Sequence, residues 1–288
     1  MSTNGQIRIK PASILLYGRS KIGKSSQFIR GFGPKALYIA CERGAILPGT
    51  IPNLNPWRHD GTRVAADGPN IVLPRDLIND PGSKYPTLDF VEAVSTTDPF
   101  GEVEKMIDTY AVPGIDAGRY GAVVLDGLTE WTERIWAWIN ATIEAKHLAH
   151  GRGFSNHLFP KVKGIVRRLL ELGVWFGAVA HEREPSNFEG RVKLGAPNLI
   201  GGLGDSTPQF FDVVLHCEVG TLPGRSRERI FHCDPLDPDW ITGERFGVMA
   251  QREPADLREI LKRVAARQRG EAITIPVFET PKEQQLGF

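Results

Sequence analysis

The sequence has few cysteines, no long hydrophobic run and no excess of charge of one sign. Three cysteines in 288 residues are too few for a disulfide framework, so we expect reduced thiols and a cytoplasmic protein. No apolar stretch approaches the roughly 18 residues of a membrane-spanning helix, and the first residues lack a signal-peptide core. Because 35 basic residues balance 34 acidic ones, a uniformly basic coat for nucleic acid is excluded, and any polyanion site must be local.

Strands and helices are predicted to alternate along the chain. Apolar or β-branched runs bounded by turn residues predict strands at Ser13–Tyr17, Ala36–Cys41, Gly121–Asp126, Val174–His181, Phe211–Val219 and Arg229–Cys233. Helical spacing predicts helices at Lys24–Arg30 (stopped by Gly31), Gly101–Ala111, the segment after Asp126, Leu158–Leu172 and Pro254–Arg267. This order favours an α/β fold with a mostly parallel central sheet flanked by helices. The last strands have no helix between them, which predicts an antiparallel edge.

Glycine and proline are abundant, with 31 and 21 residues, and they concentrate in two regions. Such clusters are typical of long loops inserted into a regular core. We expect one domain over residues 1–268, with inserted loops at about 45–100 and 182–208. Residues 269–288 are polar and lack periodicity, which predicts a C-terminal tail.

The segment from Gly18 to Ser25 matches the phosphate-loop pattern G-x-x-x-x-G-K-[ST] at every fixed position. An apolar strand precedes it and a short helix follows, so backbone N–H groups and a helix N-terminus can face a phosphate. We expect ATP and Mg²⁺ here, with Lys24 on the β/γ-phosphates and the Ser25 hydroxyl on the metal. The residues expected to bind the nucleotide are Gly18, Arg19, Ser20, Lys21, Ile22, Gly23, Lys24, Ser25 and Ser26.

Carboxylates at the ends of two other predicted strands complete the expected site. Asp126 ends the run Ala122–Asp126, where ligands of parallel sheets bind, and it is interpreted as the second Mg²⁺ partner; it can also cap the following helix. Position 127 is glycine, so no glutamate follows Asp126 directly. Glu42, just past a strand, is the candidate that orients the attacking water, with Glu130 as a weaker rival. A solvated loop glutamate is the alternative for Glu42.

Taken in order, these pieces resemble RecA-like P-loop ATPases, in particular small phage NTP-binding proteins that include single-strand-annealing recombinases. The resemblance runs over about residues 12–265. It rests on the phosphate loop and on four further segments: Leu37–Gly44, Val123–Glu130, Gly177–Glu182 and Gly243–Gly247. Two positions depart from the family pattern, since Gly127 replaces a commoner Ser and Gly243 stands where a Lys is expected. Residues 45–100 have no counterpart that we can align.

The resemblance implies an oligomeric ATPase, as a hexameric ring or a filament, that acts on DNA in phage recombination or replication within the bacterial host cytoplasm. It implies that His181 senses the γ-phosphate, with a locally satisfied buried histidine as the alternative. It also implies that Arg245 acts on the nucleotide of a neighbouring subunit, where it would meet charge on the γ-phosphoryl group. Arg225 and Arg227 are alternates for that role. The phage or host recombination and replication proteins are the implied protein partners.

In RecA relatives the loop after the sensor strand contacts single-stranded DNA, which here assigns Arg183, Phe188, Arg191 and Lys193 to that role. Cations suit phosphates and an aromatic ring suits a base. An ordinary loop or a nucleotide lid is equally consistent with these residues. Two other functions therefore remain open: a nucleotide-dependent switch or assembly motor on a protein partner, and a small-molecule phosphotransferase with Arg183 and Arg191 as a closing lid.

Two His-Cys pairs, His216-Cys217 and His232-Cys233, have the composition of a zinc site. Neighbouring residues on a strand point to opposite faces, so a tetrahedral site from both pairs would need distorted strands. We therefore do not expect a Cys₂His₂ site. The sequence also lacks an [NT]-K-x-D element for guanine, which favours adenine.

Overall fold

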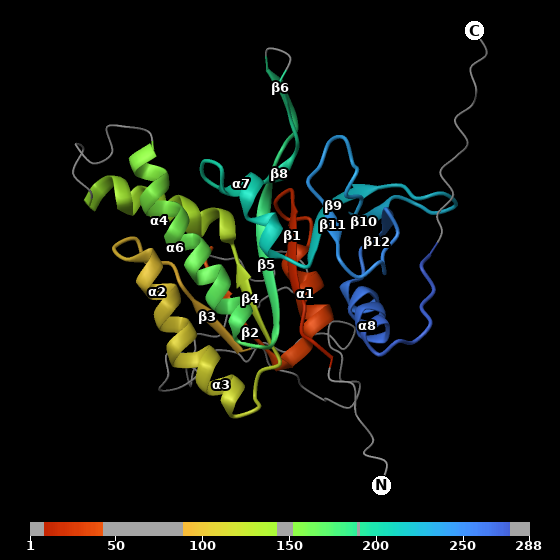
Figure 1. The fold of residues 1–288 in the computed structure, drawn as a ribbon, viewed down its shortest axis with the longest axis horizontal. Helices are drawn as coiled ribbons and strands as arrows, with labels where there is room; N and C mark the ends of the chain where they lie inside the picture. Colours follow the sequence, from red (N-terminus) through yellow and green to blue (C-terminus); the bar gives the residue numbers. More distant parts are fainter. Residues whose placement is uncertain (1–8, 43–88, 143–151, 189–190, 277–288) are drawn as a thin grey trace.

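The computed structural model describes residues 9–42, 89–142, 152–188 and 191–276. One sheet organises these residues, and its main path follows the order β12-β10-β9-β1-β5-β4-β2-β3 (Figure 1). The strands are β1 (Ser13–Gly18), β2 (Ala36–Ala40), β3 (Asp89–Glu92), β4 (Ala122–Asp126), β5 (Trp175–Arg183), β9 (Val213–Gly220), β10 (Glu228–His232) and β12 (Arg252–Pro254).

Strand direction divides the sheet into a parallel part and an antiparallel edge. From β9 through β1, β5, β4 and β2 to β3, each neighbouring pair is parallel. The pairs β9–β10 and β10–β12 are antiparallel. The α/β class, the mostly parallel sheet and the antiparallel edge are therefore confirmed. Because the parallel strands share one direction, their carboxyl ends meet at one edge of the sheet.

Helices cover both faces of the sheet, as Figure 1 shows. Helices α1 (Lys24–Phe32) and α8 (Leu257–Gln268) pack on one face. The other face carries α2 (Pro99–Met106), α4 (Leu128–Thr142) and α6 (Arg152–Glu171). A π-helical turn (Ile107–Ala111) and α3 (Val112–Asp116) continue from α2.

Strand β1 shows why both faces are covered. All six of its residues are buried. Ile14 and Leu16 join the core under α1 and α8, while Leu15 and Tyr17 join the core under α4 and α6. Alternate residues of a strand point to opposite faces, so a continuous apolar run needs a helical layer on each side.

Helix α1 ends later than the sequence predicts. It continues through Gly31 to Phe32, and Gly33, with a positive φ of +63°, follows as the cap residue. Gly31 has a different use, since a Cβ there would lie 3.0 Å from Leu261 Cδ1 and 3.1 Å from Leu257 on α8. Gly31 therefore allows two helices to approach closely, and Gly33 provides the stop.

The predicted start of the last helix at Pro254 was also wrong. Residues Arg252–Pro254 form β12 instead, and α8 begins at Leu257. The Asp256 side chain accepts a hydrogen bond from the Arg258 backbone N–H and caps the helix.

The two ranges expected to be inserted loops contain regular structure. Within 45–100, residues 45–88 lie outside the described residues, and Asp89–Glu92 form the edge strand β3. The range 182–208 contains a hairpin of β6 (Ser186–Phe188) and β7 (Arg191–Lys193), followed by β8 (Ala196–Pro197) and α7 (Leu203–Ser206). A short strand β11 (Gly243–Glu244) pairs with β9. Of the expected tail, residues 271–276 carry no helix or strand.

In the part of the chain that the structure describes, no helix combines the length and the apolar character needed to cross a membrane.

Gly177 lies in β5, where a larger side chain would disturb the packing of the core. A Cβ at this position would lie 2.4 Å from Phe28 Cε1 on α1, so Gly177→Ala must displace a buried ring. We expect Gly177→Ala to lower the free energy of unfolding by about 1–3 kcal/mol in urea denaturation. Gly164→Ala on α6 is the matched control, because nothing lies within 4 Å of its Cβ, and it should be neutral or stabilising. Equal stability of the two variants would contradict this packing.

Candidate functional site

The loop from Gly18 to Gly23 joins β1 to α1 at the carboxyl edge of the sheet. Gly18 has φ +156°, and a Cβ there would lie 2.3 Å from the Cys217 carbonyl oxygen on β9. Gly23 has φ +89°, and its Cβ would lie 3.2 Å from Arg229 Cζ on β10. Both positions therefore require glycine, one for close backbone approach and the other for a left-handed conformation beside a guanidinium.

Lys24 lies under this loop with its side chain folded back along it. Its Nζ donates to the carbonyl oxygens of Gly18 and Arg19, at 2.8 and 2.6 Å. The residue is only 6% exposed, and burial lowers the pKa of its ammonium group. The loop thus holds a cation among its own carbonyls, in a place where an anionic ligand would stabilise it.

Ser25 and Asp126 form an adjacent pair of oxygen donors. The buried Asp126 carboxyl, at the end of β4, accepts a hydrogen bond from the Ser25 side chain at the start of α1. Burial raises the pKa of Asp126 to about 7, while Ser25 and Lys24 act in the opposite direction. A hydroxyl and a carboxylate are donors that Mg²⁺ prefers, so these two residues fit the expected metal. A bound divalent cation would favour the ionised carboxylate.

Beside this pair lies a cluster of Glu42, Glu130 and His181, with donor atoms within 4.8 Å of one another. His181 Nε2 lies 2.7 Å from Glu130 Oε1 and 3.9 Å from Glu42 Oε2. The hydrogen bond to Glu130 raises the pKa of His181. Burial acts to raise the pKa of Glu130, but the hydrogen bond from His181, a backbone hydrogen bond and the charges of His181 and Lys24 together lower it. Burial, and then the charge of Glu130, raise the pKa of Glu42.

The opposite pKa shifts of the two glutamates favour Glu42 over Glu130 as a proton acceptor. The His181 imidazole holds Glu130 as a carboxylate, whereas Glu42 has no partner nearer than 3.9 Å among the ion pairs of the described residues. A carboxylate with a raised pKa is a better general base at neutral pH. The backbone N–H of His181 also donates to Thr129 Oγ1 at 2.9 Å, which ties β5 to the start of α4.

The departure at Gly127 has a structural reason. Gly127 has φ +95°, and a Cβ there would lie 3.0 Å from both the Cβ and the backbone nitrogen of Glu42. A serine would be strained in this conformation and would push Glu42 away. The glycine therefore lets the ends of β2 and β4 approach, and the Cys41 N–H donates to the Asp126 carbonyl at 2.6 Å.

Sequence reasoning missed two arginines that support the site. Arg134 on α4 donates to the carbonyl oxygens of Cys41 and Ala93, and so fixes the chain just beyond β2 and β3. Arg229 on β10 lies against Gly23. Neither belongs to a local motif. Arg134 follows Glu130 by one helical turn, which is the one signal that could have pointed to it.

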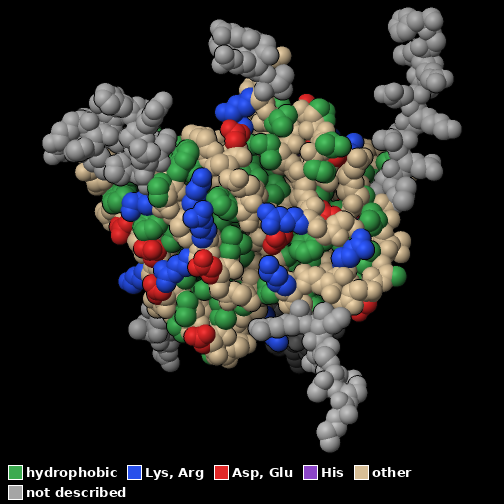
Figure 2. Space-filling view, in the orientation of Figure 1, with side chains coloured by type: hydrophobic (Ala, Val, Ile, Leu, Met, Phe, Trp, Pro, Cys, Tyr) green, Lys and Arg blue, Asp and Glu red, His purple; other side chains and the backbone are tan. Residues whose placement is uncertain are grey.

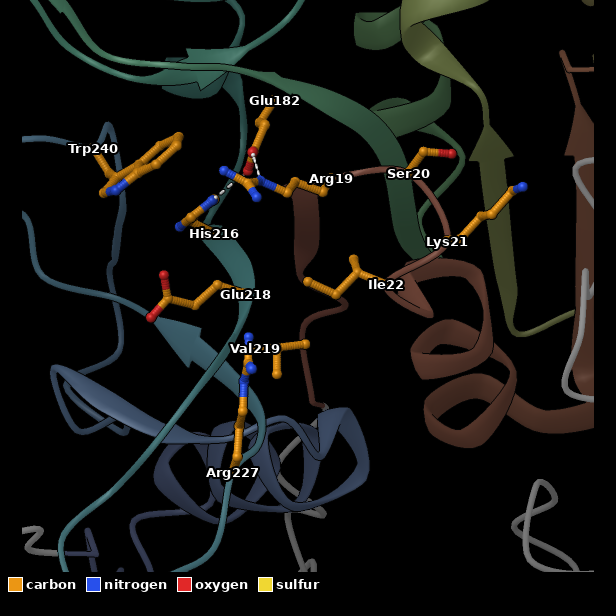
Figure 3. Close-up of a pocket in the computed structure, with 10 residues that line it drawn as sticks. All are labelled: Arg19, Ser20, Lys21, Ile22, Glu182, His216, Glu218, Val219, Arg227 and Trp240. Carbon is orange, nitrogen blue, oxygen red and sulfur yellow. Dashed lines mark hydrogen bonds and ion pairs between the residues drawn. The ribbon is translucent and has the colours of Figure 1, made fainter.

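Arg19 connects the loop to the end of β5. Its guanidinium donates to Glu182 at 3.0 Å and to Glu184 at 3.1 Å. Glu182 is bound from the other side by His216 Nε2 at 2.7 Å, and the His216 ring stacks on Trp240 at 3.6 Å between centroids. Figure 3 shows Glu182, His216 and Trp240 around a cavity of about 480 Å³ beside the loop, with Arg19, Lys21 and Arg227 also on its wall.

Arg245 lies at the amino ends of the parallel strands, opposite the edge that carries the loop. Its guanidinium donates to Asp212 Oδ1 and to the Gln209 carbonyl, at 3.3 and 3.0 Å, next to the first residue of β9. Asp212 in turn accepts from Ser13 at the start of β1. Arg245 is therefore remote from the loop of its own chain. Of its two alternates, Arg225 pairs with Glu228, and Arg227 lines the cavity.

The residues assigned to DNA fall on and near the β6–β7 hairpin, which projects from the body in Figure 1. Arg183 precedes the hairpin, and its guanidinium donates to Asp205 at 2.6 Å and to the Leu194 carbonyl. Its charge is therefore already paired within the chain. Phe188 and Arg191 belong to β6 and β7, and Lys193 is exposed at the end of β7.

The raised pKa of Asp126 predicts that the free energy of unfolding depends on pH in the protein without nucleotide or metal. Its pKa of about 7 lies above the usual value, so the folded state binds a proton more tightly than the unfolded state, and stability falls as the pH rises from about 4 to about 7. Asp126→Asn should therefore stabilise the protein at pH 8 by on the order of 2–4 kcal/mol more than at pH 4. Urea unfolding with a chelator measures this, with exposed Asp116→Asn as the control. If Asp126→Asn and the wild type differed in unfolding free energy by the same amount at both pH values, this prediction would be wrong.

Comparisons with known proteins place few constraints on this chain. No protein-family model and no curated protein matches it. Among solved structures it is similar to a KaiC-like protein from the hyperthermophilic archaeon Pyrococcus horikoshii, at 14% identity and a TM-score of 0.38, over 77% of this chain and 78% of that one. It is also similar to an ATPase from the type III secretion system of pathogenic bacteria, at 14% identity and a TM-score of 0.39, over 73% of this chain and 52% of that one. Likenesses this distant do not assign an activity.

Proposed function

We propose that this protein is a Mg²⁺-dependent ATPase. The observation that carries the proposal is the juxtaposition at one sheet edge of the Gly18–Ser25 loop, with Lys24 beneath it, and of Asp126 bonded to Ser25. A glycine-rich loop at a helix N-terminus, a lysine and a hydroxyl–carboxylate pair are the parts that a triphosphate and its metal require. The RecA-like resemblance points to the same activity.

The side chains suggest a division of labour in hydrolysis. Lys24 would exchange its loop carbonyls for phosphate oxygens, and Ser25 and Asp126 would hold Mg²⁺. When bound, this metal supplies positive charge against the phosphate oxygens. Glu42 would orient the attacking water and accept its proton at a carboxylate oxygen. Glu130 and His181, bonded to each other at 2.7 Å, would position the strand ends and respond to the γ-phosphate.

Two substitutions separate binding from turnover. Lys24→Ala should abolish nucleotide binding and turnover, because it removes the cation under the loop. Glu42→Gln should keep ATP binding and slow hydrolysis by about 100-fold or more, because the base is lost. Glu130→Gln is the matched control and should slow hydrolysis less. Calorimetric ATP binding and phosphate release measure these effects, and near-normal turnover in Glu42→Gln would exclude that residue as the base.

We propose further that the active form is a ring or filament, in which Arg245 serves the neighbouring subunit. Its position at the amino end of β9, away from its own loop, supports a role in trans rather than in cis. An arginine that meets charge on a neighbour's γ-phosphoryl group can lower the barrier by several kcal/mol, about as much as other preorganised donors.

For the target, we propose single-stranded DNA, handled in phage recombination or replication and contacted through the β6–β7 hairpin. The hairpin follows directly from β5, whose His181 is paired in register with Gly18 of the loop. Arg19 bridges the loop to Glu182 and to Glu184 at the root of the hairpin. A phosphate group bound in the loop would compete with Glu182 and Glu184 for the Arg19 guanidinium. Its binding would therefore weaken the contact between the loop and the root of the hairpin. On the face carrying α2, α4 and α6, basic and acidic side chains are mixed, as Figure 2 shows.

The DNA target predicts a stimulated and salt-sensitive activity. A single-stranded oligonucleotide should raise the ATPase rate of the wild-type protein, and Lys193→Glu should reduce this stimulation without changing the basal rate, because it reverses one exposed charge. Lys262→Glu is the control, because Lys262 is also an exposed lysine and lies on α8. No stimulation by any oligonucleotide would overturn the DNA target and favour a protein partner. Phosphoryl transfer to an acceptor other than water would instead identify a phosphotransferase.

A further inference from the structure

Two histidines and a glutamate gather on the antiparallel edge of the sheet, away from the Ser25–Asp126 pair. His216 and Glu218 are two residues apart on β9, so their side chains share one face of the strand. His232 on β10 is the cross-strand partner of His216 in the register. One donor atom from each of the three lies within 4.8 Å of the others.

The neighbouring cysteines do not take part, as the strand alternation predicts. Cys217 and Cys233 point to the opposite face, where both are buried in the core under α1 and α8. The two thiols therefore cannot join the two imidazoles in a Cys₂His₂ site. Glu218 was not among the residues predicted from the sequence. The same alternation that removes both thiols brings a carboxylate next to the two imidazoles.

The His216 ring is held as a metal-ligating histidine would be. The residue is 1% exposed, and its Nε2 bonds to Glu182 at 2.7 Å. Its Nδ1 is buried and has no hydrogen-bond partner among the described residues. Metal-bound histidines usually donate their second ring nitrogen to a carboxylate, which fixes the ring. In the view of Figure 3, Glu182 and Glu218 lie on opposite sides of this ring.

The other two groups lie in direct contact and would have to separate slightly to share an ion. His232 Nε2 lies 2.7 Å from Glu218 Oε1, and its Nδ1 lies 3.7 Å from Asp237 Oδ2. Around an ion with bonds of about 2.1 Å, tetrahedral ligand atoms lie about 3.4 Å apart. Donor atoms that now lie within 4.8 Å can reach this arrangement by shifts of about an ångström.

We propose that His216, Glu218 and His232 bind one divalent transition-metal ion of the zinc type. Two imidazole nitrogens and one carboxylate suit Zn²⁺ or Co²⁺, whereas Mg²⁺ prefers oxygen donors such as Ser25 and Asp126. Bound there, the ion would join β9 to β10. It would also fix His216, and through it Glu182 and Arg19, beside the loop. Metal binding at this site does not require ATP hydrolysis.

The test uses the full-length protein after chelator treatment, in excess Mg²⁺ and without nucleotide. Co²⁺ is titrated and followed by its visible absorption, and Zn²⁺ binding is followed by calorimetry. We expect one ion per chain, with affinity lowered more than about tenfold in both His232→Gln and Glu218→Gln. Glu259→Gln, an exposed carboxylate on α8, is the matched control and should bind as the wild type does.

Two results would overturn the site: no saturable Co²⁺ or Zn²⁺ uptake by the wild type, or equal affinity in the wild type and both variants. If His232→Gln does not fold, Glu218→Gln decides the question, because the change keeps the shape of a side chain that is one-third exposed. Loss of ATPase activity with intact metal binding would bear on the proposed function alone.

Discussion

Lys24 and Asp126 are both nearly excluded from water, at 6% and 3% exposed, and the rest of the site is arranged around them. A buried ion is costly unless it is paired or hydrogen-bonded, and here each has only part of what it needs. The lysine relies on the loop's own carbonyl oxygens, and the carboxyl relies on Ser25. A polyanion with a divalent cation would satisfy both at once, which supports the proposed nucleotide site.

The groups around this pair differ in how they are held. Glu130 is hydrogen-bonded to His181. This bond helps to lower the pKa of the glutamate and raises the pKa of the imidazole. Glu42 is positioned by backbone instead, through the close approach of Gly127 and the contacts of Arg134. Two carboxylates in one cluster thereby acquire different proton affinities, a pattern typical of acid–base sites.

Arg19 gives the loop a second set of connections. Through Glu184 it reaches the root of the β6–β7 hairpin, and through Glu182 and His216 it reaches the antiparallel edge. Arg19 itself is 75% exposed, so its pairs are weak in water, whereas Glu182 is 8% exposed and its bond to His216 is sheltered. The bond between Glu182 and His216 of β9 is therefore the strong contact of this series. The pairs of Arg19, at the loop, are the weak ones and exchange readily with water.

Local sequence patterns were enough to predict the glycine-rich loop, the buried strand that ends in Asp126, and the alternation that gives a parallel sheet with an antiparallel edge. They did not reveal that Gly31 serves helix packing while Gly33 stops the helix, because both are glycines near the same end. The contacts of Glu130 with His181, of Arg229 with Gly23, and of Glu218 with two histidines emerge from the folded chain alone. Those contacts join residues of different strands and helices, and their distances are set by strand order and register, which local sequence patterns do not specify.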